Sequence, residues 1–404
     1  TRLSQAAIPQ ELSSSVALDY MAKVVQAQAL TFGFKDAFLA LAAVFVLALI
    51  PAWIFARAKQ ALPGRFPGCR WKFAALRVVP GPELRATFPS MYRPKQGGIA
   101  MRILVNGQQA FGKAVLERLL ATDDEVVGVY CGPDRDSGPV DPIKAYAEEQ
   151  GIPVFQPRSF RKPEVWQEMR SLEPDLGVMA YVTLFVPEEA LNIPRLGTIQ
   201  YHPSLLPDHK GPSSINWPII FGKEKTGLSI FWPDNGLDTG PILLQKEVAV
   251  GPDDTLGSIY FNHLFPMGVD AMMEAVELVK NGQAPKDAQD PDAGTYEGWC
   301  RAEDAEIDWS KSTEETYNLI RGCNPQPGAW TRYDGATVQI FDSARGTGSG
   351  GSPGRITSIS ESGIGISTND GEIIVNRLRP QGGGKITASE FAEQAGLSVG
   401  ETFG

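Results

Sequence analysis

The chain has 404 residues, of which 43% are hydrophobic and 21% are charged, a composition typical of a globular protein with two or three domains. Its four cysteines lie far apart with no CxxC pair, which argues against a zinc site or a disulfide framework and fits a reducing compartment. Only three histidines are present, so a histidine-rich metal cage is excluded and no metal is expected: His202, His209 and His263.

The net charge of -10 is unevenly distributed along the chain. Residues 1–100 carry 12 Lys and Arg against 4 Asp and Glu, which leaves 25 basic and 43 acidic residues, a net of -18, in 101–404. A surface this acidic repels phosphate backbones unless it holds a local basic patch. The charge therefore weighs against a nucleic-acid partner such as tRNA, without excluding one.

The first hundred residues contain an almost unbroken apolar run at 37–56, followed by a stretch rich in Lys and Arg. About 20 such residues span a bilayer core as a helix, and the basic residues predict that the downstream part stays cytoplasmic. A buried helix is an alternative, and the interpretation we favour is that residues 1–100 are a fusion or a mis-called upstream extension before a natural start at Met101. We expect a cytoplasmic location, with the chain tethered to the inner face of the membrane if residues 1–100 are genuine.

From residue 102 onward, predicted strands and helices alternate. Strands are expected at 102–106, 125–130, 153–155, 176–180, 197–202, 227–232 and 242–250. Helices are expected at 107–120, 141–150, 161–172, 212–221 and 255–280, the last capped by Thr255. This alternation predicts an α/β, Rossmann-like, mostly parallel sheet over 101–300. The spacing Gly-x-x-x-x-Gly from Gly107 to Gly112 is not the dinucleotide-binding fingerprint.

Two of the predicted strands lead to residues that carry chemistry. The strand that ends at His202 runs on into Pro-Ser-Leu-Leu-Pro, and the strand that ends at Trp232 runs on into Gly-Leu-Asp-Thr-Gly, which contains Asp238. If these strands are neighbours, the imidazole and the carboxylate meet at the edge of the sheet where open α/β folds bind ligands. Such a pair moves protons near neutral pH.

These motifs resemble the family of formyltransferases that use 10-formyltetrahydrofolate, which includes methionyl-tRNA formyltransferase and the hydrolase domain of 10-formyltetrahydrofolate dehydrogenase. The family pattern is Asn-x-His, Ser-Leu-Leu-Pro and Gly-Leu-Asp-Thr-Gly. His202, 204–207 and 236–240 match it, whereas Gln200 stands where most members have Asn and Asp208 where they have Arg. Details around 201–204, 215–217, 229–232 and 243–246 favour the hydrolase domain.

The resemblance implies a set of site residues and a formyl donor. The donor is 10-formyltetrahydrofolate, and the implied catalytic residues are His202, Asp238 and Gln200. Gln200 lies two residues before His202, so on a strand both side chains point to one face, where the amide would donate to the oxyanion. The implied folate-binding residues lie in the loop after the fourth strand and in the turn before Asp238: Leu184, Phe185, Val186, Asp234 and Gly236. From the residues alone, a plain loop with inward-packed side chains is the preferred interpretation of 184–186.

After residue 300 the pattern changes to short strands, expected at 329–333, 337–342, 355–358, 363–368 and 372–378, after a helix at 313–322. This spacing predicts a small barrel over 301–404, and the resemblance implies an OB-like one. We expect it to lie beside the mouth of the site, and we find no interleaving of basic and aromatic residues typical of nucleic-acid binding.

The function expected first is hydrolysis of 10-formyltetrahydrofolate to tetrahydrofolate and formate. Formylation of methionyl-tRNA and of a small amine are alternatives, and a folate-binding regulatory module that lacks catalysis, because of Gln200, is a non-enzymatic alternative. Among the other histidines, His209 is expected near the surface and His263 in the core. Asn216 fits substrate contact or helix packing equally well. The sequence carries no signal from which the oligomeric state can be predicted.

Overall fold

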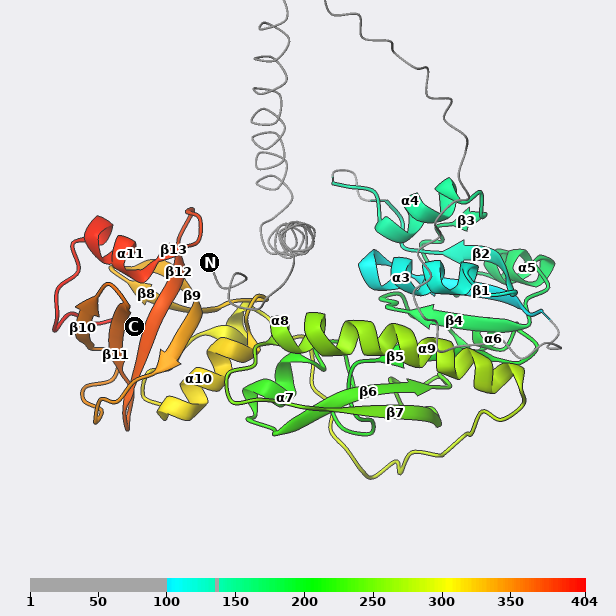
Figure 1. Cartoon of the computed structure of the whole chain (residues 1–404). Coiled ribbons are helices and arrows are strands. Elements are labelled where there is room, and N and C mark those ends of the chain that lie inside the picture. The colour runs from blue at the N-terminus through cyan, green and yellow to red at the C-terminus, as the bar shows by residue number, and fades with distance from the viewer. Residues whose placement is uncertain (1–99, 135–137) are drawn as a thin grey trace, which may run out of the picture. The chain divides into compact units, whose positions relative to one another are not determined.

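The computed structural model describes residues 100–134 and 138–404, and its first part is a seven-stranded sheet (Figure 1). The strand order is β3-β2-β1-β4-β5-β6-β7. The strands are β1 (Arg102–Gly107), β2 (Glu125–Tyr130), β3 (Val154–Phe155), β4 (Leu176–Ala180), β5 (Thr198–His202), β6 (Lys225–Phe231) and β7 (Ile242–Ala249). The first five are parallel, whereas β6 pairs antiparallel with both β5 and β7. The Rossmann-like α/β prediction is confirmed as a mixed sheet.

Helices cover both faces of this sheet, because each parallel strand needs a crossover before the next one begins. Residues of α3 (Gln109–Leu120), α4 (Pro142–Glu149) and α9 (Phe265–Lys280) join the larger core cluster on one face. There Phe111 stacks on Tyr201 with ring centroids 4.3 Å apart. Residues of α5 (Pro163–Ser171) and the short α6 (Glu188–Leu191) pack in a separate cluster on the other face.

The single long helix predicted at 255–280 is interrupted. Thr255 caps α8 (Leu256–Ile259), as predicted, and its side chain accepts a hydrogen bond from the backbone of Ser258. A π-helical turn, Tyr260–Leu264, separates α8 from α9, and Pro266 in the first turn of α9 removes a backbone donor that a continuous helix would use. His263 lies in the π-helical turn and is exposed, so the expectation of a core histidine was wrong.

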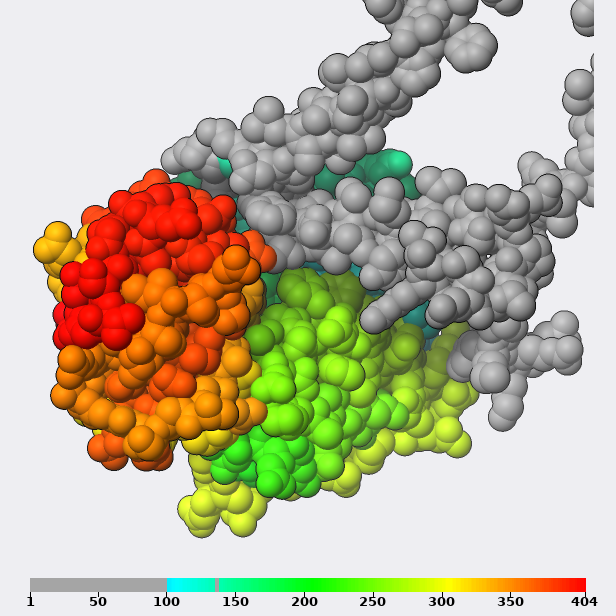
Figure 2. Space-filling model, turned by 60° about the vertical axis from the view of Figure 1, so that its left-hand side comes forward, coloured from blue at the N-terminus to red at the C-terminus, as the bar shows by residue number. Residues whose placement is uncertain are grey.

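The second part is an antiparallel sheet in the order β10-β11-β12-β9-β8, with β13 paired to β12. It follows α10 (Thr313–Gly322), and α11 (Ala388–Ala395) packs against it; its surface is the orange and red area of Figure 2. The strands are β8 (Ala329–Tyr333), β9 (Ala336–Arg345), β10 (Ile356–Ser360), β11 (Gly363–Ser367), β12 (Glu372–Pro380) and β13 (Ile386–Thr387).

The last residues of the chain bridge the two edges of this sheet. Ile356 on β10 donates to the backbone oxygen of Glu401 across 2.7 Å, and the backbone nitrogen of Gly404 donates to Arg332 on β8 across 2.9 Å. A sheet whose edges are bridged leaves fewer unpaired backbone groups exposed. Asn216, at the start of α7 (Asn216–Ile220), is buried and donates to the carbonyls of Gly322 and Gln326, which ties the two parts together.

The apolar run at 37–56 lies outside the described residues. Over 100–134 and 138–404, none of the helices combines the length and the apolar character needed to cross a bilayer.

Candidate active site

The structure brings His202 and Asp238 together at the C-terminal edge of the parallel strands. His202 is the last residue of β5, and Asp238 lies in the turn between β6 and β7. β6 runs antiparallel to β5, with Ser229 opposite His202 and Phe231 opposite Gln200, so the turn between β6 and β7 folds back to bring Asp238 to the end of β5. The Nδ1 atom of His202 lies 3.7 Å from Oδ2 of Asp238, and their side chains are 7% and 6% exposed.

Backbone groups of the loop after β5 hold both side chains. The Nε2 atom of His202 lies 2.9 Å from the carbonyl oxygen of His209, and the backbone N–H of Gly211 donates to Oδ2 of Asp238 across 2.9 Å. A carbonyl only accepts, so Nε2 carries a proton, and Nδ1 faces the carboxylate. The 3.7 Å gap exceeds a direct hydrogen bond, so a polar substrate atom is needed to bridge the two groups.

The backbone conformation of the turn explains the composition of the Gly-Leu-Asp-Thr-Gly motif. Asp238 has φ of 56°, a left-handed conformation that Asp tolerates better than most residues. Oδ1 of Asp234 accepts from the backbone of Gly236 across 2.9 Å and from Thr239 Oγ1 across 2.7 Å, which closes the turn. A side chain at Gly240 would collide with the backbone oxygen of Trp232. The turn therefore presents the carboxylate in one fixed direction.

Gln200 lies on β5 two residues before His202, on the same face of the sheet, as the strand period requires. It is half-buried, and its neighbours in register are Met179 on β4 and Phe231 on β6. Tyr201 points to the opposite face, into the larger core, and burial raises its pKa well above the ordinary value, so the phenol stays neutral. The amide of Gln200 is thus the polar group that β5 offers beside His202.

The two stretches predicted to bind folate lie next to each other. Asn235, between Asp234 and Gly236, donates to Oε2 of Glu188 across 2.6 Å and accepts from the Glu188 backbone across 3.2 Å. In the loop before Glu188, Phe185 is 49% exposed and carries the Arg161 guanidinium 4.9 Å from its ring centre. Val186 is buried and Leu184 packs against the same cluster, so these two side chains pack inward.

Sequence reasoning missed several residues around this site. His209 is 7% exposed, not at the surface, and its Nδ1 lies 3.2 Å from Oε2 of Glu297. Gln289 donates to the backbone oxygens of Asp238 and Gly240 across 2.9 and 2.7 Å. Gln108 donates to Thr183 Oγ1 across 3.1 Å, near the predicted folate loop. Gln289 and Glu297 belong to an irregular segment without periodicity, which gave no signal in the sequence.

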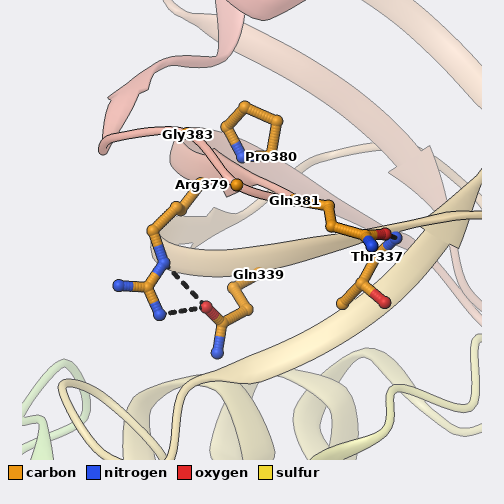
Figure 3. Close-up of a pocket in the computed structure, with 7 residues that line it drawn as sticks. Thr337, Gln339, Arg379, Pro380, Gln381 and Gly383 are labelled. Carbon is orange, nitrogen blue, oxygen red and sulfur yellow. Dashed lines mark hydrogen bonds between the residues drawn. The ribbon is translucent and has the colours of Figure 1, made fainter.

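Two hollows of about 420 and 400 Å³ lie away from these residues. Figure 3 shows the first, on the antiparallel sheet, where Arg379 donates to Oε1 of Gln339. Beside it, Lys385 Nζ lies 3.6 Å from the ring centre of Phe341, and Arg379 lies 5.6 Å from the same ring. The ring of Phe341 is buried, so these contacts do not form an exposed surface of interleaved basic and aromatic side chains, and the sequence-based expectation stays a prediction. In the described part of the chain, there is no cluster of three or more potential metal ligands.

Comparison with known families gives the class of the protein. The formyl transferase model matches residues 101–276, and the model of the formyl transferase C-terminal domain matches 300–396. The mitochondrial 10-formyltetrahydrofolate dehydrogenase of Mus musculus is 40% identical over 319 residues, which are 75% of this chain and 34% of that protein. The methionyl-tRNA formyltransferase of Geobacter metallireducens is 33% identical over 309 residues, 75% of this chain and 99% of that protein.

The chain therefore belongs to the formyl transferase family, and it is an enzyme of that family. It spans about a third of the length of the dehydrogenases it matches. Its fold is similar to that of HypX from Aquifex aeolicus in complex with tetrahydrofolic acid, with a TM-score of 0.55 and 19% identity over 74% of this chain and 48% of that one.

Proposed function

We propose that this chain transfers the formyl group of 10-formyltetrahydrofolate to water and releases formate and tetrahydrofolate. The observation that carries the proposal is the buried pair of His202 and Asp238, 3.7 Å apart at the ligand-binding edge of the sheet. The names of the dehydrogenase relatives, and the tetrahydrofolic acid bound in the HypX structure, support the donor. We also propose that 101–300 is the catalytic domain and 301–404 a separate barrel.

In the proposed reaction the oxygen of water bonds to the formyl carbon, and the bond from that carbon to N10 breaks. The His202–Asp238 pair accepts the proton that water loses and returns one to N10, the leaving nitrogen. The tetrahedral intermediate carries negative charge on the formyl oxygen, and the amide N–H of Gln200 donates to it. No covalent bond to the protein is needed, and burial strengthens these interactions because the side chains are shielded from bulk solvent.

We propose that the pterin lies along the loop at 184–186 and the turn at 234–236. The hydrogen bonds between Asn235 and Glu188 support this placement, because they hold the loop and the turn beside each other. The exposed ring of Phe185 offers a flat surface to the heterocycle, and the backbone at Leu184 and Val186 offers peptide groups while their side chains pack inward. Asp234 and Gly236 then line the opposite side.

Two observations support water as the acceptor. Residues 101–404 have a net charge of -18, which repels the phosphates of a tRNA. Asp208 stands directly after Ser-Leu-Leu-Pro, where a basic residue is expected in the family, and it adds negative charge close to the site.

Methionyl-tRNA is the second candidate acceptor, because the chain covers 99% of a methionyl-tRNA formyltransferase. A small amine is a third acceptor, and a folate-binding module without turnover is the non-enzymatic alternative.

Incubation with 10-formyltetrahydrofolate alone separates these functions. Stoichiometric release of formate and tetrahydrofolate supports the hydrolase. Turnover that begins only with charged initiator tRNA, or only with an added amine, supports the corresponding transferase and contradicts hydrolysis. Tight folate binding without turnover under all three conditions supports the binding module.

A further inference from the structure

The loop after β5 places a backbone group against each of the two candidate catalytic side chains. The carbonyl of His209 lies 2.9 Å from Nε2 of His202, and the N–H of Gly211 lies 2.9 Å from Oδ2 of Asp238. These groups are two residues apart in the chain, so any shift of the loop alters both contacts together. The position of residues 209–211 therefore sets the tautomer of His202 and the direction of the Asp238 carboxylate.

This loop has an unusual backbone. His209 has φ of 55° and Gly211 has φ of 104°, and a side chain at Gly211 would collide with the carbonyl of Glu297. Left-handed conformations outside glycine cost free energy and persist where the surroundings impose them. The conformation of His209 thus requires a support from elsewhere in the molecule.

The support is a short segment that we call the strap, residues 293–297, which runs parallel to the loop. The backbone N–H of His209 donates to Thr295 Oγ1 across 2.9 Å, and that of Lys210 donates to the Thr295 carbonyl across 3.0 Å. The backbone N–H of Glu297 donates in turn to the Lys210 carbonyl across 3.2 Å. The strap thus pairs with the loop almost as a strand would.

A largely buried side-chain pair joins the strap to the loop. Nδ1 of His209 lies 3.2 Å from Oε2 of Glu297, and the two side chains are 9% and 14% exposed. The charge of Glu297 is costly to bury alone, and so is the imidazole of His209 without a partner. Each therefore holds the other in place, and through the backbone of His209 the pair also fixes Nε2 of His202.

We propose that His209 and Glu297 are positioning residues for formyl transfer, which act by keeping the 209–211 loop against His202 and Asp238. The inference deepens the proposed function and rests on it. It assigns to the strap a role in turnover rather than in folate binding, since neither residue belongs to the loop at 184–186 or the turn at 234–236.

The test compares Glu297→Ala and Glu297→Gln in the full chain. Glu297→Ala should lower kcat for formate release about 10- to 100-fold, because small displacements of reacting groups have effects of this size. Its affinity for tetrahydrofolate should stay within about threefold of wild type, since only the turnover step loses alignment. Glu297→Gln keeps an oxygen that accepts from His209 and should recover most of kcat. The matched control is Glu247→Ala, which removes an exposed ion pair with Lys225 and should leave kcat unchanged.

A second readout does not depend on turnover. The chain has three histidines, so nitrogen-15 labelling of histidine gives few imidazole signals, and the exposed His263 serves as an internal reference. His202 should appear as the tautomer protonated at Nε2 in the wild type and in Glu297→Gln, and should lose this preference in Glu297→Ala.

Unchanged kcat together with an unchanged His202 signal in Glu297→Ala would overturn the proposal. A parallel loss of kcat, folate affinity and thermal stability would also overturn it, because it would indicate a purely structural pair. If the wild type releases no formate, the proposed function fails, and the tautomer measurement alone then decides whether the strap positions His202.

Discussion

Gln289 donates a hydrogen bond to the backbone oxygen of Asp238 across 51 residues of chain, with an N···O distance of 2.9 Å. A second bond from the same amide reaches the carbonyl of Gly240 across 2.7 Å. The two bonds hold the backbone of the turn that presents the Asp238 carboxylate. Each is worth about 0.5–1.5 kcal/mol, so we expect Gln289→Leu to lower kcat for formate release about tenfold.

The control for this prediction is Gln283→Leu, an exposed glutamine in the same irregular region. Steady-state kinetics with 10-formyltetrahydrofolate would check both variants. A wild-type kcat in Gln289→Leu would show that the turn holds its conformation without the two hydrogen bonds from Gln289.

Gln200 tests whether a side-chain amide stabilises the oxyanion. Gln200→Leu introduces an apolar side chain of similar size and removes the amide N–H that would donate to the oxyanion. We expect kcat to fall about 10²- to 10³-fold, the usual cost of losing one oxyanion donor, while tetrahydrofolate affinity changes little. Single-turnover kinetics would measure the chemical step directly, and a loss below about twofold would remove Gln200 from the mechanism.

The side chain of Ser229 joins the Ser-Leu-Leu-Pro segment to the sheet by hydrogen bonds. Its buried hydroxyl donates to the Ser204 carbonyl across 2.7 Å and accepts from the Leu206 backbone across 3.1 Å and from Gln245 across 2.9 Å. Ser229→Ala leaves buried groups unpaired and should lower the free energy of unfolding by about 1–3 kcal/mol. Urea unfolding checks this, with exposed Ser171→Ala as the neutral control; equal losses in the two variants would contradict it.

The described cysteines should differ in reactivity. The thiol of Cys323, 4.0 Å away, lowers the pKa of Cys300 by hydrogen bonding, whereas burial raises the pKa of Cys131 to about 11. The same hydrogen bond, together with burial, raises the pKa of Cys323. Because the thiolate reacts, iodoacetamide should modify Cys300 first, and its rate should level off at a lower pH than that of Cys131.

Mass spectrometry of the labelled peptides measures this order. Cys323→Ala removes the hydrogen-bond donor and should slow the modification of Cys300. Faster labelling of Cys131 than of Cys300 at pH 8 would contradict the assignment.

The sheet could be predicted because each parallel strand is a short apolar run bounded by turn residues, and the motifs around His202 and Asp238 mark strand ends. The π-helical turn at Tyr260–Leu264 could not, because its apolar residues keep a helical spacing and the interruption follows from local backbone geometry. The exposure of His263 follows from that turn.

The supports of the site were also beyond sequence reasoning. His209 sits among polar and proline residues that resemble a surface loop, and its burial depends on Glu297, 88 residues away. Gln289 contacts Asp238 from an irregular segment whose composition indicates only a loop. Contacts of this kind depend on tertiary structure, so residue type and spacing carry no trace of them.

The most direct test of the account is formate release from 10-formyltetrahydrofolate by the wild type, His202→Ala and Asp238→Ala, with tetrahydrofolate affinity measured in parallel. The account predicts formate release by the wild type and none by either variant, while affinity stays within about tenfold of wild type, since both residues act on the reacting atoms. Formate release at the wild-type rate in either variant would contradict it.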